Sequence, residues 1–126
     1  MMKRFFAIVP LMLLAALAVA QQPRAPKLAS PLHIPIAPSG TFAEVRSNHY
    51  HGGVDLRIGG DDGIGTPVYA PADGYVSRLR ISAYDGGKML YLNHDGNLTT
   101  VYLHLDGYHG AIADYVLAFQ ARNQCY

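Results

Sequence analysis

The sequence predicts a mainly β protein, a compact antiparallel β-sheet domain with a short helix near the C-terminus. Three observations lead to this fold class. Short runs rich in β-branched and aromatic residues follow one another from residue 41 onward. Clusters of Gly with Asp or Asn separate these runs and are typical of tight turns, because these residues tolerate positive φ. A single segment near the C-terminus changes to helical periodicity.

The N-terminus is too apolar to belong to a folded domain. Lys3 and Arg4 precede an almost uninterrupted apolar stretch, and Ala18-Val19-Ala20 supplies the small residues that signal peptidase requires. Residues 1–20 therefore indicate a removable signal peptide. The alternative is an uncleaved membrane anchor, but the stretch is shorter than the roughly 20 residues that a bilayer span needs. We expect an exported protein, periplasmic or extracellular, with no stable membrane anchor after cleavage.

Residues 21–40 contain five prolines, which remove backbone donors and prevent a regular helix. An extended lead-in is expected here. The folded domain is then expected over residues 41–126.

Five runs within this domain are expected to form strands, and their spacing predicts an antiparallel meander. They lie at Val54–Ile58, Val68–Ala70, Tyr75–Ile81, Lys88–Leu92 and Leu98–Leu105. Asp95-Gly96, between the last two runs, is the clearest hairpin turn. Beyond the strands, apolar residues recur at i, i+3, i+4 and i+7, which predicts an amphipathic helix at about 110–122.

Composition excludes two classes of protein. Two of the 10 Lys and Arg residues fall in the signal segment, and the remaining 8 nearly balance the 9 Asp and Glu residues. No cluster of basic residues indicates a nucleic-acid partner. Cys125 is the only cysteine, so an internal disulfide framework is excluded as well. The chain is long enough for one modest core.

His51 and Asp55 are the first candidates for chemistry. They stand four residues apart in His51-Gly52-Gly53-Val54-Asp55. An even separation on a strand places both side chains on one face, and the glycines let the backbone bend so that they converge. Imidazole and carboxylate both bind zinc at about 2 Å. Two ligands do not complete a site, and a solvated His51 beside a turn-capping Asp55 is the alternative.

His104 is the second candidate, near the end of an expected strand in Tyr102-Leu103-His104-Leu105. Its imidazole suits an acid–base group or a transition-state stabiliser beside a metal. The alternative is a partly buried, hydrogen-bonded histidine without a catalytic role.

Five short blocks follow one another in the chain: His51-Gly52-Gly53-Val54-Asp55-Leu56, Gly65-Thr66-Pro67-Val68-Tyr69-Ala70, Asp73-Gly74-Tyr75-Val76, Asn93-His94-Asp95-Gly96 and Thr100-Val101-Tyr102-Leu103-His104-Leu105. In this order they resemble the lysostaphin/LytM-type zinc endopeptidases, and the resemblance covers roughly residues 41–106. The resemblance implies a mainly antiparallel β domain with a zinc ion at the floor of a groove. A secreted enzyme that hydrolyses peptide cross-links of bacterial peptidoglycan is implied, associated with the cell envelope.

Site residues follow from the resemblance position by position. His51 and Asp55 correspond to the first two Zn²⁺ ligands, and His104 to the active-site imidazole. His94 matches a position outside the metal shell and is assigned a structural role. The implied chemistry is metal-assisted hydrolysis, with a water activated at neutral pH and an imidazole that stabilises the tetrahedral intermediate.

One part of the family pattern is missing from the sequence. Relatives carry a later His-x-His strand whose second His is the third zinc ligand, and nothing after His104 has that form. His49 could join His51 and Asp55, although three ligands from seven residues would be crowded. We expect an incomplete chain that is inactive as given. A catalytically dead domain that binds cell wall or regulates an amidase is the first alternative, and a carbohydrate-binding or structural β domain is the second.

Overall fold

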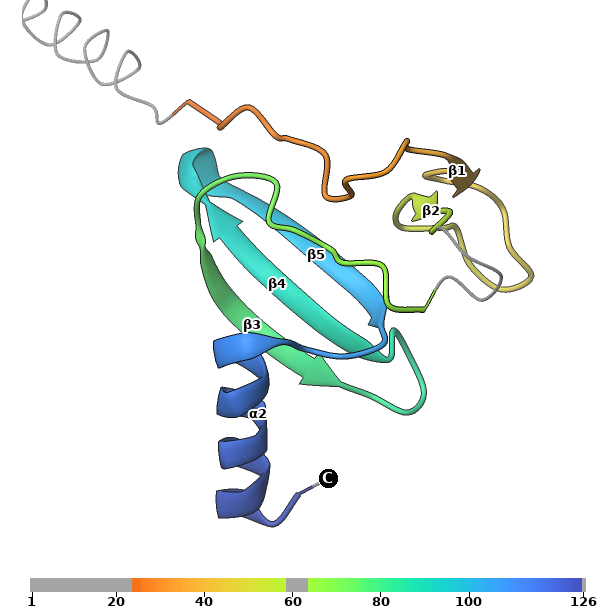
Figure 1. Ribbon diagram of the computed structural model, residues 1–126. Helices are drawn as coiled ribbons and strands as arrows, with labels where there is room; N and C mark the ends of the chain where they lie inside the picture. The colour runs from red at the N-terminus through yellow and green to blue at the C-terminus, as the bar shows by residue number, and fades with distance from the viewer. Residues whose placement is uncertain (1–23, 59–63, 126) are drawn as a thin grey trace, which may run out of the picture.

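The computed structural model describes residues 24–58 and 64–125, so the expected signal peptide lies outside the described residues. Its elements form two antiparallel sheets and one helix, which confirms the mainly β class (Figure 1). In chain order they are β1 (Pro38–Gly40), β2 (Asp55–Leu56), β3 (Tyr75–Ile81), β4 (Lys88–His94), a 3-10 turn η1 (Asp95–Asn97), β5 (Leu98–Leu105) and α2 (Gly110–Asn123).

The larger sheet has the order β3-β4-β5, with both strand pairs antiparallel. β3 and β5 have the predicted bounds, whereas β4 continues to His94, two residues further than predicted. The predicted hairpin at Asp95-Gly96 joins β4 to β5. Gly96 has φ of 70° there, a backbone angle at which glycine carries no side-chain penalty.

The predicted strand at Val54–Ile58 is shorter than expected and belongs to a different sheet. Only Asp55–Leu56 is a strand, and it pairs with Pro38–Gly40 at the end of the proline-rich segment. The expectation of one five-stranded meander is therefore wrong. β1 and β2 form a small second sheet at one end of the larger one (Figure 1).

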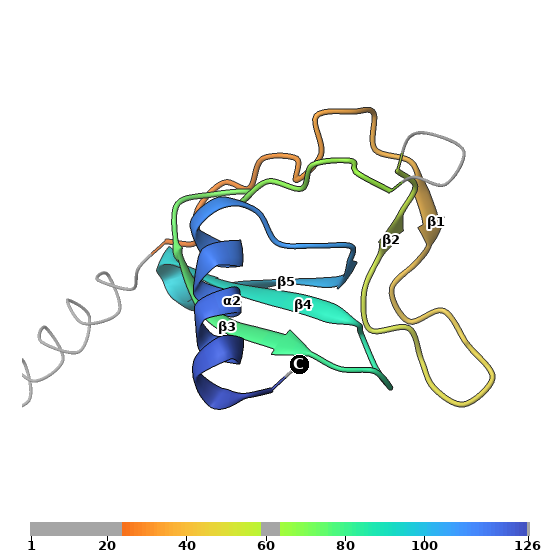
Figure 2. The ribbon, with the colours of Figure 1, turned by 60° about the horizontal axis from the view of Figure 1, so that its bottom comes forward.

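The predicted strand at Val68–Ala70 is wrong. Pro67 and Pro71 flank it and have no backbone N–H, so a regular ladder cannot form across this segment. Tyr69 N instead donates to the carbonyl of Pro31 at 2.9 Å, and the ring of His33 stacks on Tyr69 at 3.9 Å. The proline-rich segment thus runs beside residues 64–74 along the larger sheet (Figure 2).

The core of the described residues is small and lies on β4. Met89, Leu90 and Leu92 are buried there, and Leu32 from the proline-rich segment is buried with them. His94 is the buried polar residue, 7% exposed. Its Nδ1 N–H donates to the carbonyl of Asp73 at 2.8 Å, so Nε2 of the neutral ring accepts from the Thr100 hydroxyl at 2.9 Å. His94 therefore connects the end of β4 to β5 and to the turn before β3 by hydrogen bonds.

Replacing His94 with alanine is expected to destabilise the fold by about 2–4 kcal/mol, because it opens a cavity at a buried position and removes the hydrogen bonds to the Asp73 carbonyl and the Thr100 hydroxyl. Urea denaturation followed by circular dichroism measures the change. His109→Ala is the matched control, since His109 is exposed. Equal stabilities of the two variants would contradict the structural role of His94.

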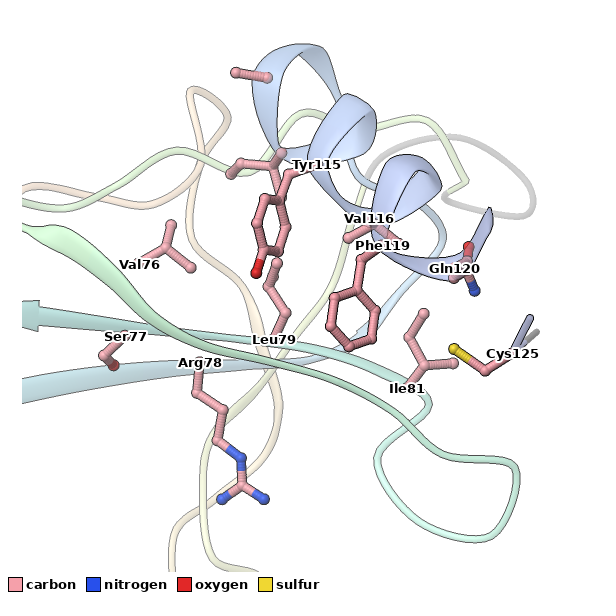
Figure 3. Close-up of a pocket in the computed structure, with 12 residues that line it drawn as sticks. Val76, Ser77, Arg78, Leu79, Ile81, Tyr115, Val116, Phe119, Gln120 and Cys125 are labelled. Atoms are coloured by element: carbon pink, nitrogen blue, oxygen red, sulfur yellow. The ribbon is translucent and has the colours of Figure 1, made fainter. Parts of the chain in front are cut away.

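The predicted helix at 110–122 is confirmed as α2, and Gln124 caps its C-terminus in the left-handed conformation. Its apolar stripe faces β3 across a groove of about 710 Å³ (Figure 3). Phe119 and Tyr115 point toward Leu79 and Ile81, but no residue of α2 is buried. No helix among the described residues is long and apolar enough to cross a membrane. The groove contains none of the three candidate site residues.

Candidate active site

A tight hairpin at residues 41–51 positions the first candidate, His51. The backbone N–H of Ala43 donates to the carbonyl of His51 at 2.8 Å, and the N–H of His51 donates to Glu44 at the same distance. Val45 and Tyr50 form a bridge nearer the turn. These bonds fold the chain back so that His51 enters the Gly-rich approach to β2 next to Thr41.

Asp55 begins β2 and lies opposite Gly40 on β1. The structure brings it to His51, with 3.2 Å between His51 Nε2 and Asp55 Oδ1. The other carboxylate oxygen, Oδ2, pairs with the Arg46 guanidinium at 2.5 Å. The Asp55 carboxylate therefore has one oxygen on an arginine and one directed at an imidazole.

The tautomer of His51 follows from its second contact. His51 Nδ1 lies 3.0 Å from the carbonyl oxygen of Thr41, which can only accept, so Nδ1 carries the proton. In the neutral ring Nε2 then presents a lone pair. A carbonyl bond at one nitrogen is the usual way in which a metal-binding histidine is oriented.

Two lone pairs, on His51 Nε2 and Asp55 Oδ1, face each other across 3.2 Å. They repel unless a positive charge is shared between them, either a proton on Nε2 or a metal ion bound by both atoms. Two ligands of a tetrahedral zinc ion, each about 2.0–2.1 Å from it, are separated by roughly 3.3 Å. The pair thus fits two neighbouring positions of a zinc site.

Arg46 also keeps Asp55 ionised. Its hydrogen bond to the carboxylate is the largest cause that lowers the pKa of Asp55 below the ordinary value, and partial burial of the carboxylate opposes this only in part. An ionised carboxylate is the form that binds a metal.

His104 lies near the end of β5, and its side chain is exposed. Its φ is 57°, in the left-handed region that few non-glycine residues adopt. The backbone N–H of His104 donates to the carbonyl of Gly86 at 2.8 Å, and Gly87 lies against its Cα. The Gly86-Gly87 turn therefore holds His104 in this conformation.

No three His, Cys, Asp or Glu side chains converge as a metal site requires anywhere in residues 24–58 and 64–125. His49, the alternative third ligand, is bonded to Asn48 at 2.5 Å and does not join His51 and Asp55. Asp61 and Asp62 fall in the segment that is not described. His51 and Asp55 therefore form a two-ligand arrangement in the described part of the chain.

Sequence reasoning missed three residues that support the ligands: Gly40, Thr41 and Arg46. Their spacing carries no motif, because each acts through a contact created by the hairpin and by pairing of β1 with β2. Gly40 was placed in the lead-in, yet a Cβ there would stand 2.7 Å from the Arg46 guanidinium and still closer to Asp55 Oδ2. Only glycine lets the arginine–carboxylate pair approach β1 this closely.

Gly40→Ala is accordingly expected to displace the Arg46–Asp55 pair and to destabilise the protein by about 1–3 kcal/mol, the usual effect of overpacking. Gly107→Ala is the control, because a Cβ at Gly107 meets nothing within 4 Å. Thermal unfolding of the two variants measures the difference. An unchanged unfolding temperature in Gly40→Ala would show that β1 can move away from the Arg46–Asp55 pair without loss of stability.

Comparison with known proteins identifies the family. The profile described as Peptidase family M23 matches residues 49–120, more than half of the chain, and the match includes His51, Asp55 and His104. The chain belongs to peptidase family M23. Membership places the chain in a family of peptidases, and it agrees with the resemblance to lysostaphin/LytM-type enzymes in the sequence.

A relative from Haemophilus influenzae supports the assignment to family M23. It is described as an uncharacterized metalloprotease and is 42% identical to this chain over 55 residues. The match covers 44% of this chain but only 11% of the relative, so the chain spans a small part of that protein's length. No solved structure matches this M23 chain.

Proposed function

We propose that this M23 domain belongs to an exported zinc-dependent endopeptidase that hydrolyses peptide cross-links of bacterial peptidoglycan. The observation that carries the proposal is the His51–Asp55 pair, whose Nε2 and Oδ1 atoms lie 3.2 Å apart in a chain of peptidase family M23. The apolar segment at the N-terminus supports export, and peptidoglycan is a peptide-containing polymer outside the cytoplasmic membrane.

Each residue has a separate role in this proposal. His51 Nε2 and Asp55 Oδ1 hold the zinc ion, and a third protein ligand comes from outside the described residues. Bound zinc polarises the scissile carbonyl and makes water acidic enough to attack at neutral pH. Thr41 fixes the ring of His51 through Nδ1, and Arg46 fixes the Asp55 carboxylate through Oδ2.

His104 acts on the substrate side of the site. From the end of β5 its imidazole donates a proton to the leaving amine or stabilises the oxyanion of the tetrahedral intermediate. Its unusual backbone angle supports this role, because strained conformations persist mainly at functional sites.

A hollow beside His104 is suited to a peptide. It has a volume of about 670 Å³ and runs between residues 64–70 and the strands β4 and β5. Its walls are mostly apolar and include Leu90, Leu92 and Tyr102. Such a surface fits short peptide stems with small apolar side chains, bound beside His104.

The test is zinc content together with hydrolysis of purified peptidoglycan, measured on this chain and on the full product of its gene. Zinc bound near one equivalent, with new amino termini released from peptidoglycan, is the expected result for the full product. A full product that is well folded, free of zinc in zinc-containing buffer and inactive would overturn the proposal.

A further inference from the structure

The Arg46–Asp55 pair is the shortest ion pair in the described part of the chain, and it involves a residue that the proposed function uses as a metal ligand. Arg46 reaches the site from the hairpin at residues 41–51, where its backbone N–H donates to the carbonyl of His49 at 2.9 Å. Its guanidinium therefore approaches Asp55 from an anchored backbone.

We propose that Arg46 is a positioning residue that keeps Asp55 a ligand through one oxygen, Oδ1, and this inference rests on the proposed function. The Arg46 guanidinium occupies Oδ2 at 2.5 Å, while Oδ1 lies 3.2 Å from His51 Nε2. A carboxylate can bind a metal through one oxygen or two. With Oδ2 held by Arg46, only Oδ1 is directed at the metal position.

The same arginine is linked to the second ligand. Arg46 Nη2 lies 3.8 Å from Glu44 Oε2, and this Glu44 oxygen accepts from the backbone N–H of Thr41 at 3.0 Å. The Thr41 carbonyl in turn accepts from His51 Nδ1. Arg46, Glu44 and Thr41 thus form a continuous support that orients Asp55 at one end and His51 at the other.

Two effects of Arg46 on metal affinity oppose each other. Its positive charge repels a cation, whereas its hydrogen bond orients the ligand. The side chain is 36% exposed, so solvent screens the repulsion, while the orientation is local and unscreened. Hydrogen-bond partners of metal ligands typically change metal affinity by about 10–100-fold. Orientation is therefore the larger effect, and loss of Arg46 weakens binding.

The experiment titrates the full product of the gene with Co²⁺ and with Zn²⁺, and records the visible absorption of bound Co²⁺ as well as affinity. Wild type is compared with Arg46→Ala, Arg46→Lys and Arg80→Ala. Arg80 is the matched control, since it forms an exposed ion pair with Asp85 at 3.1 Å, away from His51 and Asp55. Circular dichroism establishes that each variant is folded.

We expect Arg46→Ala to bind both metals about 10–100-fold more weakly. Its Co²⁺ absorption should also fall per bound ion, because release of Oδ2 lets Asp55 bind through both oxygens and raises the coordination number above four. Arg46→Lys should restore much of the wild-type spectrum, since an ammonium can still occupy Oδ2, and Arg80→Ala should behave as wild type.

Wild-type affinity and spectrum in a folded Arg46→Ala would overturn the positioning role while leaving the metal site intact. Equal losses in Arg46→Ala and Arg80→Ala would also overturn it, because they would trace the effect to general charge. A wild-type chain that binds neither metal would overturn the proposed function together with this inference, so the two failures are distinct.

Discussion

His51→Ala is expected to abolish peptidase activity and to weaken zinc binding by about 100-fold or more, beyond the usual effect of losing an outer partner of a ligand. The alanine removes Nε2, one of two lone pairs that face each other at 3.2 Å. Without it Asp55 remains paired with Arg46 alone, and the proposed zinc site keeps only two of its three protein ligands. Zinc content after dialysis and release of amino groups from peptidoglycan measure the two effects.

His49→Ala is the control for this experiment. His49 stands two residues away in the same hairpin, but its ring is bonded to Asn48 and does not contact Asp55. We expect it to keep wild-type zinc content and activity. If His49→Ala lost zinc and His51→Ala did not, His51 would be excluded as a ligand.

His104→Asn is expected to lower kcat by about 10²–10⁴-fold, the usual contribution of acid–base catalysis, while zinc content stays unchanged. Asparagine is chosen because it tolerates the left-handed backbone angle of 57° at this position, so the turn with Gly86 and Gly87 should remain. Single-turnover hydrolysis of a defined peptidoglycan fragment measures the rate. Metal analysis and thermal unfolding of the same sample accompany it.

The opposite pattern would contradict the assignment of His104. A variant that loses zinc but keeps its rate per bound zinc would make His104 a ligand. A variant with both unchanged would show that the imidazole contributes only to folding.

Local sequence patterns predicted the larger sheet well. β3 and β5 begin and end where alternation and turn residues place them, and Asp95-Gly96 forms the expected hairpin. These features depend on neighbours in sequence. Val68–Ala70 has strand-like composition but lies between two prolines, and its hydrogen-bond partner is Pro31, about forty positions earlier in the chain. Composition alone does not reveal such a partner.

The candidate site could be predicted only where its residues are close together in the sequence or lie in a family-like block. His51 and Asp55 are four residues apart, so their convergence is visible in the sequence. His104 became a candidate because it lies in one of the five family-like blocks and because a titratable side chain is unusual between apolar neighbours. Arg46 and Gly40 were missed because their contacts with Asp55 depend on β1 pairing with β2 and on the hairpin between them.

Asp55 lies on β2 and His104 on β5, so the candidate site joins two different sheets, and this has a consequence for folding cooperativity. β1 and β2 are only three and two residues long, so their ladder should open at a lower free energy than the β3-β4-β5 sheet. A metal that binds only the closed form stabilises it by RT ln(1 + [M]/Kd). Metal supply would then act as a local folding switch: under chelation residues 38–56 are expected to unfold while β3-β4-β5 persists, so the proposed metal site would be lost without global unfolding.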